Sequence, residues 1–282
     1  MPPITNTRIM ALFCDFENIA LGVRDVKYSA FDIQKVLERL LLKGNIVVKK
    51  AYCDWDRYKE FKASMHEAAF ELIEIPHVRQ SGKNSADIRM VVDALDLCYT
   101  KAHVDTFVII SGDSDFSPLV SKLRENNKLV IGVGVKKSTS DLLIANCDEF
   151  IYYDDLVRET ESKKQRIAKQ AKPKAASAKS TKPNAAKAGE TKTTEEQKRQ
   201  QALDWMMETV EDLFEERGEE EKVWGSMIKQ ALKRRKPGFN ETYHGFRTFA
   251  KLLEEAQARK LLELEFDEKS GGYIVKSLAR ED

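Results

Sequence analysis

A short apolar run in the middle of the chain constrains its fold most. Phe107 to Ile110 are continuously apolar, and Ser111 and Gly112 follow at once, before two carboxylates, Asp113 and Asp115. A run without polar alternation is typical of a strand buried on both faces of a parallel sheet. Ligands of open α/β sheets bind beyond the carboxyl ends of the strands. The run therefore predicts a central strand that delivers acids to the edge where a site forms.

The first half of the chain alternates apolar runs of strand length with stretches whose apolar residues recur at helical spacing. Strands and helices that alternate in this way form right-handed βαβ units with parallel strands. We therefore expect an α/β fold for residues 1–158, a Rossmann-like three-layer α/β/α sandwich with a mostly parallel sheet. The predicted strands are 8–15, 46–52, 71–75, 104–111, 128–135 and 150–153. The predicted helices are 31–43, 56–70, 86–101, 118–125 and 140–145, with a loop over 16–30.

Residues 159–194 are predicted to be a basic flexible linker. Between Ser162 and Lys192 the sequence holds ten Lys or Arg and one acid, Glu190. The remainder is mainly Ala, Ser, Thr, Gln and Pro, which cannot bury enough apolar surface to fold alone, although the first turns are compatible with an extension of the preceding helix. A solvated tether of this charge also attracts nucleic-acid phosphate, and salt weakens that attraction.

Residues 195–282 are predicted to form a small winged-helix domain. Apolar residues at helical spacing predict helices over 195–217, 222–235 and 241–258, and a hairpin follows at 262–266 and 273–275. The second helix carries a basic cluster that we expect to contact RNA, although lysines on a helix are more often a solvated face. Its members are Lys229, Lys233, Arg234, Arg235 and Lys236.

The amino-acid composition excludes some classes of function but does not identify a binding partner. Lys and Arg number 47 against 46 Asp and Glu, so net charge alone indicates no polyanionic ligand. The four cysteines are scattered, with no CxxC pair and no histidine at metal-binding spacing, which favours reduced core residues and argues against zinc. With neither a signal-peptide pattern nor an apolar run of membrane-spanning length, we expect a cytoplasmic protein without membrane contact.

Acids stand at three places where apolar segments end: Asp15 after the first strand, Asp87 at the start of a helix, and Asp113 with Asp115 after the central strand. If the first and central strands are neighbours, their carboxyl ends bring these acids together. Repelling carboxylates favour a cation, and oxygen ligands suit Mg²⁺ or Mn²⁺. Such an ion supports hydrolysis of a phosphodiester. Taken singly, each acid is better explained as a helix cap or turn residue; their joint placement favours a site.

Three further residues are candidates with weaker individual support. Asn18 is predicted to orient a water or a phosphate, and a turn role is about equally compatible. Lys83 is predicted to contact the scissile phosphate, although a loop lysine is usually only solvated. Asp93 stands six residues after Asp87 on the same helix, away from its face, and is predicted to hold a helix or loop in place.

Three motifs in order resemble the NYN domain, a branch of the PIN-like ribonuclease superfamily that includes bacterial LabA-type proteins. They are Leu12 to Asn18, Lys83 to Leu95, and Ser111 to Phe116. The resemblance spans roughly residues 8–157 and implies a PIN-like fold with a Mg²⁺- or Mn²⁺-dependent endoribonuclease site. By motif, Asp15, Asp87, Asp113 and Asp115 would be the catalytic and metal-binding acids, Asn18 a polar group of the site and Asp93 a supporting acid. Residues 224–275 resemble, more weakly, the OST-HTH/LOTUS domain, a winged helix implicated in RNA binding.

Two functions from different classes fit these features. The first is an endoribonuclease whose C-terminal domain recruits RNA, and the second is a non-catalytic RNA-binding or regulatory adaptor. Other phosphotransfer folds fit less well, since a Toprim domain expects Glu where Asp15 stands and a receiver domain expects paired acids there. RNA is the expected partner; apolar helix faces are also compatible with a homodimer, and the C-terminal domain with a protein partner.

Overall fold

The structure, a computed structural model, describes residues 7–26, 28, 30–75, 84–170, 189–218 and 221–278. These residues form two compact units, one within residues 7–170 and one from residue 189 onward. Half of the predicted linker, residues 171–188, lies outside the described residues. Within the described ranges, no helix combines the length and the apolar character that crossing a membrane requires.

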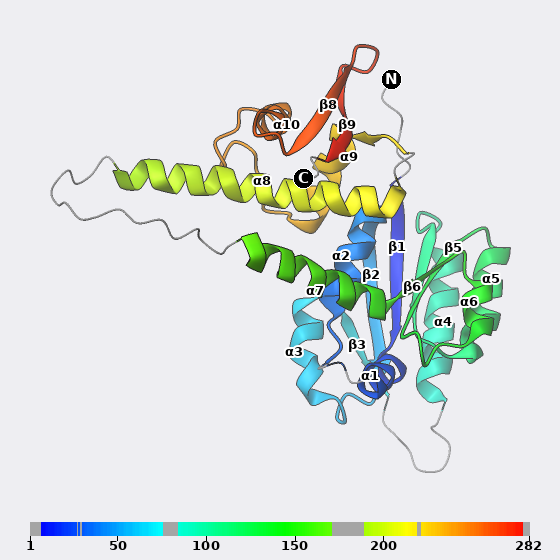
Figure 1. Cartoon of the computed structure of the whole chain (residues 1–282). Coiled ribbons are helices and arrows are strands. Elements are labelled where there is room, and N and C mark those ends of the chain that lie inside the picture. Colours follow the sequence, from blue (N-terminus) through cyan, green and yellow to red (C-terminus); the bar gives the residue numbers. More distant parts are fainter. Residues whose placement is uncertain are drawn as a thin grey trace, which may run out of the picture. The chain divides into compact units, whose positions relative to one another are not determined.

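A six-stranded parallel sheet forms the centre of the first unit (Figure 1). Its strands are β1 (Arg8–Asp15), β2 (Gly44–Cys53), β3 (Glu71–Glu74), β4 (Thr106–Ile110), β5 (Leu129–Gly134) and β6 (Glu149–Tyr152). Their spatial order is β3-β2-β1-β4-β5-β6, and every neighbouring pair is parallel. All five residues of β4 are buried, as the continuous apolar run predicts. The expected pairing of the first and central strands is confirmed, with Leu12 of β1 beside Val108 of β4.

Helices cover both faces of this sheet, which confirms the three-layer α/β/α sandwich. One face packs against α1 (Phe16–Asp25), α2 (Ile33–Lys43), α3 (Lys59–Glu67) and α7 (Tyr153–Gln170). The other face packs against α4 (Ser85–Thr100), α5 (Ser117–Glu125) and α6 (Asp141–Asn146), with a 3₁₀ turn η1 (Ser114–Phe116) before α5. Full burial of one large apolar side chain stabilises the fold by about 1.5–3 kcal/mol. The two apolar layers therefore hold the strands in place, and with them the residues at the strand ends where a site forms.

The first helix begins where the sequence pattern predicted a loop. Asp15 caps α1, because its side chain accepts a hydrogen bond from the Asn18 N–H. Phe16, Ile19 and Val23 are buried along one side of the helix, at the spacing that an amphipathic helix requires. The helix is only ten residues long, so the pattern was too short to stand out. At the other end of the unit, α7 continues to Gln170, so the helix before the predicted linker extends into it.

The second unit has the element order of a winged helix. Its elements are α8 (Gly189–Arg217), β7 (Val223–Trp224), α9 (Gly225–Arg235), α10 (Phe249–Ala258), β8 (Leu262–Asp267) and β9 (Gly272–Leu278), and its antiparallel sheet has the order β7-β9-β8. The predicted hairpin is present. The third helix begins at Phe249 rather than at 241, because Gly245 has a positive φ of 79° and Thr248 caps the helix. The two-residue strand β7 was too short to predict.

Candidate functional site

The predicted acids gather where the order of the sheet strands reverses. Chain connections run outward in one direction from β1 and in the other from β4, so the crevice between these two strands is the topological switch point. Asp15 is the last residue of β1, and Asp113 follows β4 after Ser111 and Gly112. Because the strands are parallel, both acids lie at the same edge of the sheet.

Asp15 is a buried carboxyl held by two donors. It is 7% exposed; Oδ1 accepts from the Asn18 N–H at 3.3 Å, and Oδ2 accepts from the Ser111 hydroxyl at 2.9 Å. Burial raises the pKa of Asp15 to about 7, and the nearby charges of Asp87 and Asp113 add to the rise. The two hydrogen bonds oppose it, since they favour the ionised form. Asp15 thus titrates near neutrality.

Asp87 joins this environment from the first turn of α4. Burial raises its pKa above the ordinary value, and the charges of Asp113, Asp115 and Glu17 raise it further. Asp113 and Asp115 are themselves fixed by a turn, in which Asp113 Oδ1 accepts from the Asp115 N–H at 2.9 Å. The four predicted acids therefore act on one another electrostatically, although they come from three separate parts of the chain.

These carboxylates do not form a ready-made set of ligands around one position. Among the described residues, no three His, Cys, Asp or Glu side chains lie near enough to one another to hold a metal ion. The donor type still matches a hard cation such as Mg²⁺ or Mn²⁺, because every ionisable donor is a carboxylate oxygen. Burial is the main cause of the raised pKa values of Asp15 and Asp87, and a cation between the acids would relieve the repulsion that adds to it.

Asn18 links α1 to the loop after β4. Its side-chain oxygen accepts from the Gly112 N–H at 2.8 Å, which leaves the amide hydrogens on Nδ2 as donors. Gly112 is required here by space, since a Cβ atom would lie 2.5 Å from the Ser138 carbonyl oxygen. The loop that carries Asp113 is therefore clamped between Asn18 and the turn after β5.

Asp93 has partners of its own on α4 and β2. Its carboxylate accepts from the Tyr52 hydroxyl at 2.8 Å and from Arg89 Nε at 3.0 Å, and it pairs with Lys50 at 3.4 Å. Tyr52 is the β2 residue beside Asp15 in the sheet register. Asp93 thus ties α4 to β2 next to the acid cluster, which is the geometry of a positioning residue.

The predicted RNA-contacting cations have different surroundings. Lys83 lies outside the described residues. Arg235 is buried against Asp212, with Nη1 2.6 Å from Oδ2, so it joins α9 to α8. Lys229 pairs with Glu241 at 2.6 Å, and burial lowers the pKa of Arg234. Lys233 and Lys236 are the exposed members of the predicted cluster.

A basic and aromatic patch on the second unit includes Lys236 of the predicted cluster, but its other members were not predicted. Lys198 lies over the exposed ring of Tyr243 at 4.3 Å, and Lys236 lies 5.9 Å from the ring of Trp205. The buried His244 ring contacts both aromatic rings, at 5.5 Å from Trp205 and 5.2 Å from Tyr243. We call these five residues the aromatic patch. Its members are up to 46 positions apart, so sequence spacing gave no signal.

Sequence reasoning also missed the hydrogen bond from Ser111 to Asp15 and the effect of the Glu17 charge on the pKa of Asp87. Both residues belong to the motifs quoted above, and Ser111 stands directly after the β4 run. A buried hydroxyl beside a carboxylate becomes visible only when the neighbouring strand is known, because Ser111 and Asp15 are 96 positions apart.

Comparison with known proteins supports the fold and the first resemblance. A family model described as the NYN domain matches residues 9–154. An uncharacterized protein of Methanocaldococcus jannaschii is 26% identical over 143 residues, which are 51% of this chain and 55% of that protein. The meiosis regulator and mRNA stability factor 1 of Xenopus tropicalis is 24% identical over 159 residues, which are 56% of this chain and 9% of that protein.

A crystal structure of a Vibrio parahaemolyticus protein of unknown function is 27% identical, covers 53% of this chain and 95% of that chain, and has a TM-score of 0.47. The chain spans about half the length of the archaeal relative and a small part of the Xenopus one. The OST-HTH/LOTUS resemblance of the second unit stays a prediction. Because the NYN model matches more than half of the 282 residues, the chain belongs to the NYN domain family, within the PIN-like nuclease superfamily.

Proposed function

We propose that the protein is a metal-dependent endoribonuclease that hydrolyses RNA phosphodiester bonds, with its second unit recruiting the RNA. One observation carries the proposal: acids from three separate chain segments gather at the switch point, where burial and the charges of neighbouring acids raise the pKa values of Asp15 and Asp87. Such an arrangement costs stability unless a positive charge enters it, and perturbed pKa values of this kind cluster at functional sites.

The residues that would hold a Mg²⁺ or Mn²⁺ ion are Asp15, Asp87, Asp113 and Asp115. When bound, the ion supplies a polarised phosphoryl oxygen and an activated water for in-line attack. Burial raises the pKa of Asp15 to about 7 in the absence of the ion, and a bound cation would favour its ionised, ligating form. The Nδ2 hydrogens of Asn18 suit a phosphate oxygen, because the side-chain oxygen is already committed to Gly112.

An open groove beside the acids offers a path for the strand. It has a volume of about 620 Å³ and begins at Asp115. The hydroxyl groups of Ser114 and Ser121 line it, and such groups suit the sugars and phosphates of RNA. The groove supports a substrate that is longer than a single nucleotide.

The aromatic patch supports RNA recruitment by the second unit. Tyr243 is 64% exposed and offers a ring for base stacking, while Lys198 and Lys236 offer charge to the phosphates. The Xenopus relative is named an mRNA stability factor, which agrees with an RNA substrate. Tethering a weak RNA-binding unit to a nuclease raises the local substrate concentration without new contacts at the site.

A second candidate, an RNA-binding adaptor without activity, is favoured by a separate observation. No three acids among the described residues stand ready to hold an ion, and Asp15 also serves as the cap of α1. An adaptor would use the same fold and the aromatic patch but not the acids.

The deciding experiment is cleavage of labelled single-stranded and hairpin RNAs with Mg²⁺ or Mn²⁺. Wild type is compared with Asp113→Asn, which keeps an acceptor for the Asp115 N–H but removes the charge. The matched control is Asp25→Asn, an exposed acid at the far end of α1. We expect cleavage by wild type and by the control, and loss of cleavage in Asp113→Asn and in chelator. RNA binding without cleavage by any of these proteins would favour the adaptor.

Recruitment is tested separately with Tyr243→Ala. We expect weaker RNA binding with an unchanged cleavage rate at saturating RNA. Phe266→Ala on β8 is the control, because that ring is similarly exposed, 54% against 64%. Equal affinity of both variants and wild type would remove the aromatic patch from the proposal.

A further inference from the structure

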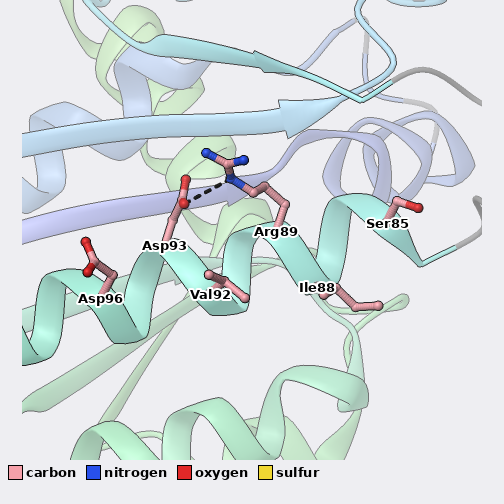
Figure 2. Close-up of a pocket in the computed structure, with 6 residues that line it drawn as sticks. All are labelled: Ser85, Ile88, Arg89, Val92, Asp93 and Asp96. Atoms are coloured by element: carbon pink, nitrogen blue, oxygen red, sulfur yellow. Dashed lines mark hydrogen bonds and ion pairs between the residues drawn. The ribbon is translucent and has the colours of Figure 1, made fainter.

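The outer face of α4 carries an apolar stripe that the first unit leaves exposed. Ile88, Val92 and Tyr99 are 63%, 55% and 62% exposed and lie on one side of the helix, four and seven residues apart. Ile88 and Val92 line an open groove of about 550 Å³ along the helix (Figure 2). An exposed apolar stripe of this length is uncommon on a helix that already packs its other side.

The inward face of α4 is packed against the sheet. Met90, Ala94 and Cys98 are buried against the sheet and account for the side of the helix that the fold requires. A helix packed on one side is expected to be polar on the opposite side. Ile88 and Val92 point away from that buried side, so packing among the described residues of the first unit does not explain them.

Two opposite charges lie beside the apolar stripe. Arg89 and Asp96 are seven residues apart, about two turns, and therefore share one face of α4. The midpoint between them falls next to Val92. Arg89 uses Nε for its own Asp93 at 3.0 Å, which leaves the other guanidinium hydrogens for a second carboxylate (Figure 2).

We propose that α4 is the interface of a homodimer, in which two copies of the helix pack antiparallel about a two-fold axis near Val92. In this arrangement Arg89 of each copy lies level with Asp96 of the other, and the apolar stripes cover one another. A parallel arrangement would instead place like charges together. The self-complementary pattern is that of an isologous interface. The inference rests on α4 alone and does not depend on the nuclease proposal.

The area of the outer face of α4 limits how stable the dimer can be. Sixteen residues of α-helix are about 24 Å long. A stable interface buries roughly 800 Å² on each partner, and the outer face of one helix is smaller than that. We therefore expect a weak dimer whose population depends on concentration.

The first test measures the oligomeric state of the full chain by sedimentation velocity over a range of concentrations. Val92→Asp places a charge on the axis, and we expect its dimer dissociation constant to rise by at least about tenfold, a change of about 1.4 kcal/mol. Leu142→Asp is the matched control, because Leu142 is 57% exposed against 55% for Val92. A wild type that stays monomeric throughout, or a dimer that Val92→Asp does not weaken, would overturn the proposal.

The second test distinguishes this pairing from any other interface. Asp96→Arg and Arg89→Asp each place like charges opposite one another, so each variant alone is expected to dimerise more weakly than wild type. An equimolar mixture restores both attractions, and we expect heterodimers there. Each variant's circular dichroism spectrum verifies folding. A mixture that associates no better than its separate components would reject the antiparallel arrangement.

Discussion

The pKa of Asp15 has a measurable consequence for folding stability. In the unfolded chain this carboxyl has its ordinary pKa of 3.8, and in the fold the pKa is about 7. Between these values the folded protein holds a proton that the unfolded chain releases, so stability falls as pH rises and becomes flat above about pH 7. The group therefore makes the protein less stable by roughly 2–3 kcal/mol at about pH 8 than at about pH 5.

Replacing Asp15 by Asn removes this titration with little change of shape. The amide oxygen still accepts from the Asn18 N–H, and the amide nitrogen can donate to the Ser111 oxygen. We expect the variant to lack the Asp15 contribution to the pH dependence and to be the more stable protein at about pH 8, where wild-type Asp15 is ionised. Asp87 also has a raised pKa, so some decline with pH remains in both proteins.

The assay is urea unfolding at a series of pH values in chelator. Trp205→Phe and Trp224→Phe are introduced into all samples so that Trp55, which is buried in the first unit, reports the unfolding of that unit. Asp25→Asn is the control and should retain the wild-type slope. Parallel stability curves for wild type and Asp15→Asn would refute the reasoning, because they would mean that Asp15 does not titrate between these pH values.

Three further outcomes test other parts of the structure. Ser111→Ala removes the buried donor to Asp15; we expect a loss of about 1–3 kcal/mol near pH 8 in the same urea assay, and an unchanged stability would contradict that contact. Adding Mg²⁺ about a hundredfold above its Kd should stabilise wild type by about 2.7 kcal/mol. It should also reduce the loss of stability with rising pH, because the ion favours ionised acids. An equal stabilisation of Asp113→Asn, read from thermal melts, would place the ion elsewhere. Arg235→Met leaves Asp212 buried without this cation and should destabilise the second unit by about 3–5 kcal/mol. Lys233→Met, at an exposed position, should change the stability of that unit by less than about 0.5 kcal/mol. Similar melting of the two variants, followed by Trp205 and Trp224 fluorescence, would count against the buried pair.

The elements with a strong local pattern were predictable from the sequence. The run through β4 identified a strand buried on both faces, and the alternation of strands and helices identified the parallel sandwich. Short or capped elements were not predictable in the same way. Helix α1 was missed because ten residues give few repeats, and the start of α10 was placed too early because the positive φ of Gly245 is a property of the folded turn.

The sequence by itself determined which residues stand at the ends of strands, and hence that Asp15 and Asp113 lie at the same edge of a parallel sheet. The tertiary structure decided that β1 and β4 are neighbours. Only the tertiary structure decided the burial, hydrogen bonds and neighbouring charges of those acids. Burial of Asp15, the Ser111 hydroxyl 2.9 Å away and the charge of Asp87 all arise from segments at least 70 positions apart, so no local pattern encodes the pKa. Arg235 gives the converse case. Its position in a basic run indicated an RNA contact, but packing of α9 on α8 turned its side chain to Asp212, because a buried cation requires an opposite charge.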